Sequence, residues 1–212
     1  MDYFIVYKPY LVLSQFSPEL GKQVLKDIFQ LPKDVYPVGR LDYDSEGLLL
    51  LTNDKKLNHL LLNPALGHEK EYFVQVDGRL TTNAISELQK GVTITVNGKP
   101  YLTKPCVAKL LEVAPDLPPR NPPVRFRKNI PTSWLSITLT EGKNRQVRKM
   151  TAKVGFPTLR LVRYRIQDFT LNNMQPGDII KFSQKTIYKK LRILKYCFVL
   201  FFPLVVNSFQ TC

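Results

Sequence analysis

VGRLDYDSEGLLLLTN, residues 38–53, joins a polar loop to an apolar strand. The loop holds two glycines and three carboxylates, and the four leucines that follow predict a strand buried on both faces. An acid at the mouth of a buried strand can be held rigidly and partly shielded from water, which suits chemistry. A solvated acidic turn would have the same composition. The stretch therefore predicts the strand and leaves the role of its acids open.

Short elements of both kinds surround this strand and indicate the fold class. Apolar or alternating runs predict further strands at residues 4–7, 72–76, 93–96 and 134–140. Helix starts are indicated at Ser17, Asp54 and Thr81, and a hairpin at Asn97-Gly98. Strands and helices do not alternate regularly. We therefore expect an α+β fold with a mixed, largely antiparallel sheet flanked by short helices.

The charge of the chain is concentrated in one segment. The 212 residues carry a formal net charge of +14. Residues 120–165 hold 12 Lys and Arg against a single acid, Glu141, whereas residues 1–119 are close to neutral. An ordinary solvated surface mixes both signs. The segment therefore predicts a polyanionic partner, and nucleic acid is the main candidate.

The cysteines and histidines give no sign of a metal site. Cys106, Cys197 and Cys212 are widely spaced, and His59 and His68 have no partners at metal-ligand spacing. We therefore expect no bound metal and reduced cysteines in a cytoplasmic protein. The first residues lack the basic stretch and long apolar run of a secretory signal.

Residues 115–131 are the least regular part of the chain. They contain six prolines, which favours an extended loop. Their cations, which we expect to contact RNA, are Arg120, Arg125, Arg127 and Lys128. A plain linker between two structured segments is the alternative interpretation.

Residues 145–154 predict an amphipathic helix that ends before Gly155. Apolar residues recur at helical spacing, and Arg145, Arg148 and Lys149 occupy much of the remaining surface. Such a helix can bury one side and turn its guanidinium groups toward a cleft or toward phosphates. A solvated amphipathic helix is the plainer interpretation, although such a helix normally carries acids as well as bases.

Two motifs resemble the signatures of a known family. Gly39-Arg40-Leu41-Asp42 and the stretch EGKNRQVRKM, residues 141–150, are similar to the two signatures of the RNA pseudouridine synthases of the RsuA type. The signatures occur in the expected order, and the likeness covers roughly residues 3–182. Further similarity, to a subgroup that acts on 23S ribosomal RNA, lies in residues 120–123, 130–135 and 155–161.

The resemblance implies roles for individual residues. In this family an aspartate attacks the target nucleoside, an aromatic ring stacks on the flipped-out base, and an arginine pairs with the aspartate. These roles match Asp42, Tyr72 and Arg148. Taken singly, Tyr72 also suits a core strand and Arg148 also suits a phosphate contact. The expected RNA contacts, with Arg40 linked to base flipping, are Arg40, Arg120, Arg125, Arg127, Lys128, Lys143, Arg145, Lys149 and Arg163.

The resemblance also implies a domain organisation. We expect a catalytic domain over residues 1–185 with a central cleft, without the small N-terminal RNA-binding domain of the S4 type that many relatives carry. Residues 186–212 are expected to form an atypical tail, basic at first and then apolar. The apolar run, residues 197–206, is about half as long as a membrane helix requires, so we do not expect membrane attachment.

The resemblance implies an enzyme that isomerises one uridine of 23S ribosomal RNA to pseudouridine, with Asp42 as nucleophile. It implies no cofactor, metal or nucleotide, and we expect a monomer. Neither the target uridine nor the choice between attack at the sugar C1′ and at the base C6 follows from the sequence. Two other classes stay open: a non-catalytic RNA-binding or ribosome-assembly module, which would not require Asp42, and a membrane-surface protein.

Overall fold

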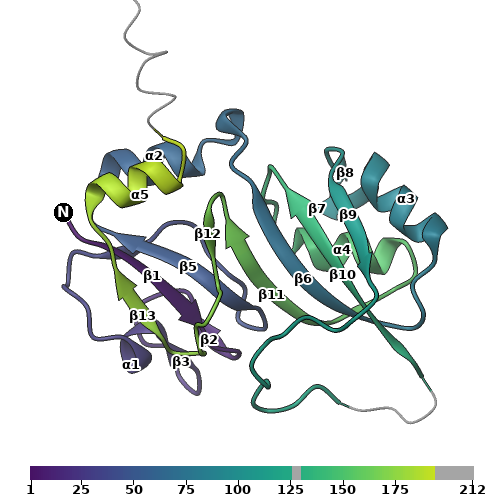
Figure 1. The fold of residues 1–212 in the computed structure, drawn as a ribbon, viewed down its shortest axis with the longest axis horizontal. Helices are drawn as coiled ribbons and strands as arrows, with labels where there is room; N and C mark the ends of the chain where they lie inside the picture. The colour runs from purple at the N-terminus through teal and green to yellow at the C-terminus, as the bar shows by residue number, and fades with distance from the viewer. Residues whose placement is uncertain (126–129, 194–212) are drawn as a thin grey trace, which may run out of the picture.

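A curved sheet forms the centre of the molecule in the computed structural model, which describes residues 1–125 and 130–193. Its strands are β1 (Tyr3–Lys8), β4 (Tyr36–Pro37), β5 (Glu46–Thr52), β6 (Lys70–Asp77), β9 (Val107–Leu111), β10 (Thr132–Leu139), β11 (Thr158–Ile166), β12 (Phe169–Thr170) and β13 (Ile179–Lys181). The main order across the sheet is β13-β1-β5-β11-β6-β10-β9, with β4 beside β5 and β12 beside β11 (Figure 1).

Short helices and two small sheets complete the described part of the chain. The helices are α1 (Leu25–Ile28), α2 (Lys55–Leu62), the 3-10 helix η1 (Pro64–Leu66), α3 (Thr82–Lys90), α4 (Gln146–Lys153) and α5 (Gln184–Lys190). The small sheets pair β2 (Val12–Leu13) with β3 (Gln23–Val24), and β7 (Thr93–Val96) with β8 (Lys99–Leu102).

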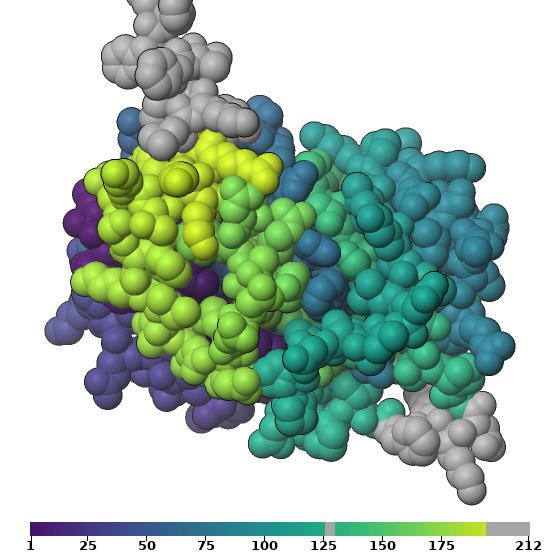
Figure 2. Space-filling model, viewed as in Figure 1, coloured from purple at the N-terminus to yellow at the C-terminus, as the bar shows by residue number. Residues whose placement is uncertain are grey.

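The large sheet consists of two antiparallel halves joined by one parallel pair. Within the described residues, β5 and β11 are the only parallel neighbours in this sheet, and their ladder pairs just Val162 with Glu46 and Arg163 with Gly47. This arrangement confirms the expected α+β class with a mixed, largely antiparallel sheet. Figure 2 shows the same division on the surface, where the C-terminal part covers one half and the middle of the chain the other.

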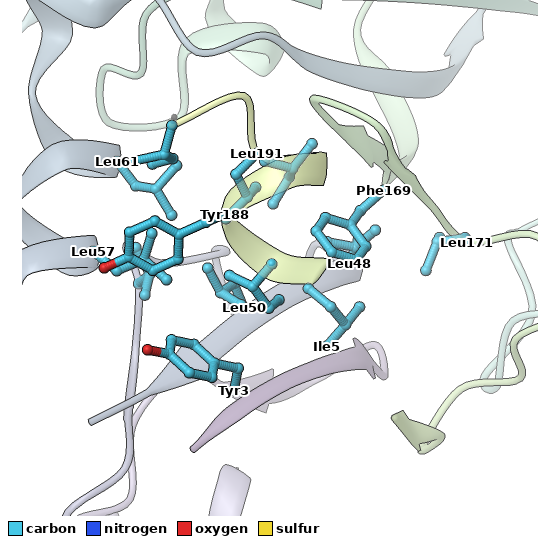
Figure 3. Close-up of a cluster of buried hydrophobic side chains, with 14 of the residues drawn as sticks. Tyr3, Ile5, Leu48, Leu50, Leu57, Leu61, Phe169, Leu171, Tyr188 and Leu191 are labelled. Atoms are coloured by element: carbon cyan, nitrogen blue, oxygen red, sulfur yellow. The ribbon is translucent and has the colours of Figure 1, made fainter. Parts of the chain in front are cut away.

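One face of the sheet is covered by α2 and α5. Leu48 and Leu50 of β5 point to this face because alternate residues of a strand point to opposite sides. They pack with Leu57 of α2 and Tyr188 of α5, which lie together over β1 and β5 (Figures 1 and 3). The Tyr188 hydroxyl donates to the Asp54 carboxylate at 2.8 Å, which ties the two helices to each other.

The opposite face carries two separate apolar clusters. Leu49 and Leu51 of β5 pack with the segment before β5, including Leu41. The strands of the other half pack with α3 and α4 in a second cluster. Tyr72 of β6 contacts both clusters. The two clusters therefore leave a gap above the parallel junction, and Tyr72 lies at its base.

The expected strands, the hairpin and three of the helices are confirmed. Asp54 and Thr81 cap α2 and α3, since their side chains accept backbone N–H groups at 3.0 and 3.2 Å. The helix start expected at Ser17 is wrong, and only Leu25–Ile28 of the expected helix forms, as α1. Residues 15–22 form bends and a turn closed by a bridge between Glu19 and Lys22, because Gly21 has a left-handed φ of +74°. Residues 23–24 then pair with β2 as strand β3.

Gly47 makes the junction between the two halves possible. A Cβ atom at this position would lie 2.4 Å from the backbone oxygen and 2.7 Å from the backbone nitrogen of Arg163. Its φ of +112° is also unfavourable for any residue with a side chain. Only glycine allows the two strands to approach so closely.

Gly47→Ala should therefore destabilise the protein by roughly 3 kcal/mol or more, the sum of a backbone clash and backbone strain. Gly98→Ala is the matched control, because Gly98 also has a positive φ but faces open space. That control should cost only about 1 kcal/mol. Urea titration of both variants measures the difference, and equal losses would show that the close approach is unimportant.

Helix α5 and the turn after it belong to the packed core of the fold. Ile187, Tyr188, Leu191 and Ile193 are all buried in the cluster that covers β1 and β5. The boundary expected at residue 185 falls inside this helix. We therefore propose that the catalytic unit extends at least through Ile193.

A chain shortened to end at Gln184 should be less stable than one shortened to end at Ile193. Removal of several buried apolar side chains should cost about 4 kcal/mol or more, and the hydrogen bond from Tyr188 to Asp54 would be lost as well. Chemical denaturation followed by circular dichroism compares the two chains. Identical midpoints would contradict the proposed extent of the unit.

A candidate active site in the central cleft

A cleft of about 850 Å³ lies over the parallel junction. One wall is the loop before β5, including Arg40, Asp42 and Ser45. The other wall is the segment from Leu139 to Val147 together with Tyr101 and Lys104 of the small hairpin and the turn after it. Its base is formed from β6 and β11, which supply the residues Lys70, Tyr72, Leu161 and Arg163. The volume is large enough for a single nucleotide.

Asp42 is held at the cleft by the backbone on either side of it. The Ser14 hydroxyl donates to the Leu41 carbonyl at 2.8 Å and accepts the Leu41 N–H at 3.0 Å. The Ser45 N–H donates to the Asp42 carbonyl at 3.0 Å and closes the turn. Within the described residues, the half-buried carboxylate of Asp42 makes no hydrogen bond or ion pair. A carboxylate in this position is available to a ligand.

Tyr72 and Arg163 are direct neighbours across the β6–β11 ladder. Residues opposite each other in an antiparallel pair point to the same face with their Cβ atoms about 5 Å apart. Both side chains line the cleft. Arg163 is buried, and its Nε donates to the Leu48 carbonyl at 2.7 Å.

Asp44, rather than Asp42, pairs with Arg145, the N-cap residue of α4, and with Arg148 within this helix. The Arg145 guanidinium donates two hydrogen bonds to the Asp44 carboxylate at 2.8 Å each. Arg148 donates to the Asp44 carbonyl at 2.5 Å, and its Nε lies 3.4 Å from the carboxylate. The expected pairing of Arg148 with Asp42 is therefore not present in this structure. The arginines instead fasten the two walls of the cleft to each other.

The pKa of Asp44 reflects this contact. Burial alone would raise the pKa of the carboxyl, but the hydrogen bond from Arg145 and the charge of Arg148 outweigh it and hold the pKa below its ordinary value. The backbone of Arg145 is left-handed, with φ of +52°. Strained backbone of this kind is held in place by surrounding contacts and often occurs at functional sites.

Glu141 organises the second wall of the cleft. Its carboxylate accepts hydrogen bonds from the Tyr101 hydroxyl at 2.5 Å, the Lys104 N–H at 3.0 Å and the Gln146 amide at 2.6 Å. Burial alone would raise the pKa of Glu141, but these hydrogen bonds outweigh the effect of burial and hold the pKa below its ordinary value. The single acid of the basic segment thus ties the start of α4 to the β7–β8 hairpin.

Two lysines lie close to the base of the cleft. Lys8 is fully buried, and its ammonium donates to the Pro9 and Val12 carbonyls at 2.8 and 2.7 Å. Burial lowers the pKa of Lys8 to about 7. Burial and the nearby charge of Arg163 lower the pKa of Lys70 to about 8. Burial is the main cause of both shifts, and Glu46, Asp44 and Asp42 lie close enough to Lys8 to oppose its shift.

The expected site residues are distributed over three environments. Those that line the cleft are Arg40, Asp42, Tyr72, Lys143, Arg145 and Arg163. Arg148 and Lys149 are half-buried on α4 beside it. Arg120 lies over the ring of Tyr10 at 4.1 Å, and Arg125 is exposed. Arg127 and Lys128 lie outside the described residues.

Some site features were not found from the sequence. Asp44, Ser45, Lys8 and the buried ion pair of Glu46 with Arg160 were not assigned a role. The ion pair has two hydrogen bonds of 2.9 Å and joins β5 to β11 next to Gly47. Its partners are more than one hundred positions apart, so no local spacing could have linked them.

The part of the chain that the structure describes holds no group of three or more His, Cys, Asp and Glu residues that could bind a metal. Among the same residues, no helix has the length and apolar character needed to cross a membrane.

A cleft that combines a carboxylate, an aromatic ring and several cations can hold a base turned out of a nucleic acid. Comparison with known proteins identifies which enzyme class this is. The family model described as RNA pseudouridylate synthase matches residues 2–153. The chain belongs to this family and is an RNA pseudouridine synthase, an isomerase.

Individual relatives place the chain more closely. It is 51% identical over 174 residues to ribosomal large subunit pseudouridine synthase E of Vibrio parahaemolyticus, covering 82% of this chain and 71% of the relative. The enzyme of the same name from Xanthomonas campestris is 51% identical over 176 residues, covering 82% and 91% of the two chains. Ribosomal large subunit pseudouridine synthase B of Bacillus subtilis is 34% identical over 193 residues, covering 91% and 72%.

A solved structure shows the same fold. The crystal structure of a pseudouridylate synthase superimposes with a TM-score of 0.70 at 26% identity, covering 89% of this chain and 73% of the other. The similarity therefore extends over both halves of the sheet and confirms the fold class expected from the sequence.

Asp44→Asn should lower the free energy of unfolding by about 1 kcal/mol at pH 7, because the ion pairs that it breaks are partly exposed. A carboxyl whose folded pKa is depressed stabilises the protein above its unfolded pKa of about 3.9 and loses that effect as the pH falls through the folded pKa. The difference between wild type and variant should therefore shrink below about pH 4.

Urea titrations at a series of pH values measure this difference. Asp116→Asn provides the control, because Asp116 is an exposed acid that does not line the cleft. A difference between Asp44→Asn and wild type that did not change with pH would show that the charge of Asp44 does not hold the two walls together.

Proposed function

We propose that this enzyme isomerises a specific uridine of 23S ribosomal RNA, with Asp42 as the nucleophile. The observation that carries the proposal is a half-buried carboxylate in a cleft that also holds an aromatic ring and several cations, in a chain of the pseudouridylate synthase family. The relatives at about half identity are named for the large ribosomal subunit, which supports the choice of RNA.

The cleft geometry supports a flipped-out base. A uridine inside RNA must leave its stack before its glycosidic bond can be reached. Tyr72 at the base of the cleft offers a ring on which the uracil can stack. Arg40, Lys143 and Arg145 at the cleft walls are placed to contact the phosphates on either side of the extruded nucleotide.

The proposed reaction needs only side chains of this chain. The Asp42 carboxylate attacks the nucleoside, the bond between C1′ and N1 breaks, and its electron pair stays on the uracil. The base rotates, C5 bonds to C1′ as the carboxylate leaves, a proton departs from C5, and N1 gains a proton. These steps are written for attack at C1′, and none of them calls for a cofactor, metal or nucleotide.

Arg148 acts through Asp44 in this proposal. It fastens the wall that carries Asp42 to α4, so it positions the nucleophile while the enzyme is free. Arg120, Arg125, Arg127, Lys128 and Lys149 extend the basic surface along the RNA, and their contacts would make binding dependent on salt. We further propose that the enzyme acts as a monomer in the cytoplasm, without membrane attachment.

Asp42→Asn should reduce turnover on a ribosomal RNA fragment by about 10⁴-fold or more, because the amide keeps the shape of the carboxylate but cannot act as the nucleophile. RNA affinity and the free energy of unfolding should stay close to those of wild type. Asp116→Asn makes the same chemical change at an exposed position and should retain full turnover. Pseudouridine is quantified by nuclease digestion and mass spectrometry.

The same experiment separates the enzyme from a non-catalytic RNA-binding module. A binding module would retain its RNA affinity in both variants and would give no pseudouridine even as wild type. Near-normal turnover by Asp42→Asn would contradict the assignment of Asp42 as the nucleophile, and it would not affect the family membership.

A further inference from the structure

Arg163 has a hydrogen-bond donor that the protein does not use. The side chain is only 4% exposed, yet it lines the cleft. Its Nε donates to the Leu48 carbonyl, but its Nη2 makes no hydrogen bond to any described residue. A buried polar group without a partner destabilises the folded protein. Such a group in a cleft indicates a partner that arrives with the ligand.

The position of Arg163 relative to Tyr72 suggests which part of the ligand it meets. The two residues face each other across the β6–β11 ladder and point to the same side of the sheet. A base stacked on the Tyr72 ring would present one edge to the neighbouring strand. The hydrogen-bonding groups on that edge of uracil include carbonyl oxygens, which accept from a guanidinium.

Other buried charges surround Arg163. Burial and, to a smaller extent, the charge of Arg163 lower the pKa of Lys70, whereas for Lys8 the effect of burial is opposed by Glu46. Glu46, the buried acid nearby, is already paired with Arg160. The buried Ser45 hydroxyl, which also lines the cleft, is a second unused hydrogen-bonding group.

We propose that Arg163 is a catalytic residue, whose Nη2 binds a carbonyl oxygen of the flipped-out uracil and stabilises the negative charge that develops on the ring. This inference rests on the proposed function. When C1′–N1 breaks, the electron pair spreads over N1, O2 and O4; addition at C6 places the pair on C5 and O4. Both routes bring negative charge to a carbonyl oxygen, where a fixed donor lowers the barrier.

The test compares Arg163→Gln with wild type in single-turnover reactions on a ribosomal RNA fragment. Loss of the charged donor should slow the reaction by about 10²–10³-fold and change RNA affinity by less than about threefold. Arg163→Lys, which keeps the charge, should be intermediate. Arg165→Gln is the matched control, because Arg165 lies on the same strand, pairs with Glu69 and Glu71, and does not line the cleft.

A second substrate distinguishes charge stabilisation from a structural role. Fluorine at C5 of the target uridine stabilises the ring anion by itself, so the defect of Arg163→Gln, measured as loss of the target nucleoside, should shrink by about tenfold on this RNA. Unfolding curves give the folded fraction of each variant. A defect that is equal on both substrates, or that follows the folded fraction, would overturn the role of Arg163.

The outcomes keep the two proposals separate. An inactive wild type would contradict the proposed function. An active wild type with an equally active Arg163→Gln variant would contradict only the present inference.

Discussion

The close approach of β5 and β11 at Gly47 is the constraint on which the molecule depends. A parallel ladder of only two residue pairs joins the two antiparallel half-sheets, which is a small contact for such a joint. It is reinforced by the Glu46–Arg160 ion pair, whose charges are both buried. Breaking one partner of such a pair leaves an uncompensated charge, which is far more costly than the pair is stabilising. The joint is therefore specific. In this register the residue without a side chain, Gly47, faces the Arg163 backbone, and the buried charges of Glu46 and Arg160 meet.

The joint also assembles the site. Because the strand after the Asp42 loop is β5 and the strand bearing Arg163 is β11, their contact places this loop beside the base of the cleft. The antiparallel ladder of β11 with β6 then adds Tyr72. The second wall is fastened separately, through Asp44 to α4 and through Glu141 to the β7–β8 hairpin. Acids around the cleft thus have structural partners, while the Asp42 carboxylate makes no such contact within the described residues.

Sequence patterns predicted the local features well and the long-range ones poorly. The four leucines, the caps at Asp54 and Thr81 and the Asn97-Gly98 hairpin each follow from interactions within a few residues, so the sequence carries them in one place. The prediction of a helix start at Ser17 was wrong because the pairing of β3 with β2 outweighed a weak local preference for helix. The strand β11 was not predicted, since its arginines hide the apolar alternation. The resemblance implied that Arg148 pairs with Asp42, whereas in the structure it contacts Asp44, two positions further along the chain. Which of the two acids it meets depends on the geometry across the cleft.

The order of the elements along the chain has a consequence for the enzyme during its synthesis. Asp42 is synthesised about one hundred residues before α4 and β11, which at about 5–20 residues per second is a delay of about 5–20 seconds. Throughout that time β1 lacks its partner β13, and Asp44 lacks Arg145 and Arg148. A nascent chain that ends before α4 therefore carries Asp42 without the complete second wall of the cleft. The cleft can form only after β11 has been synthesised, so the order of synthesis delays its assembly.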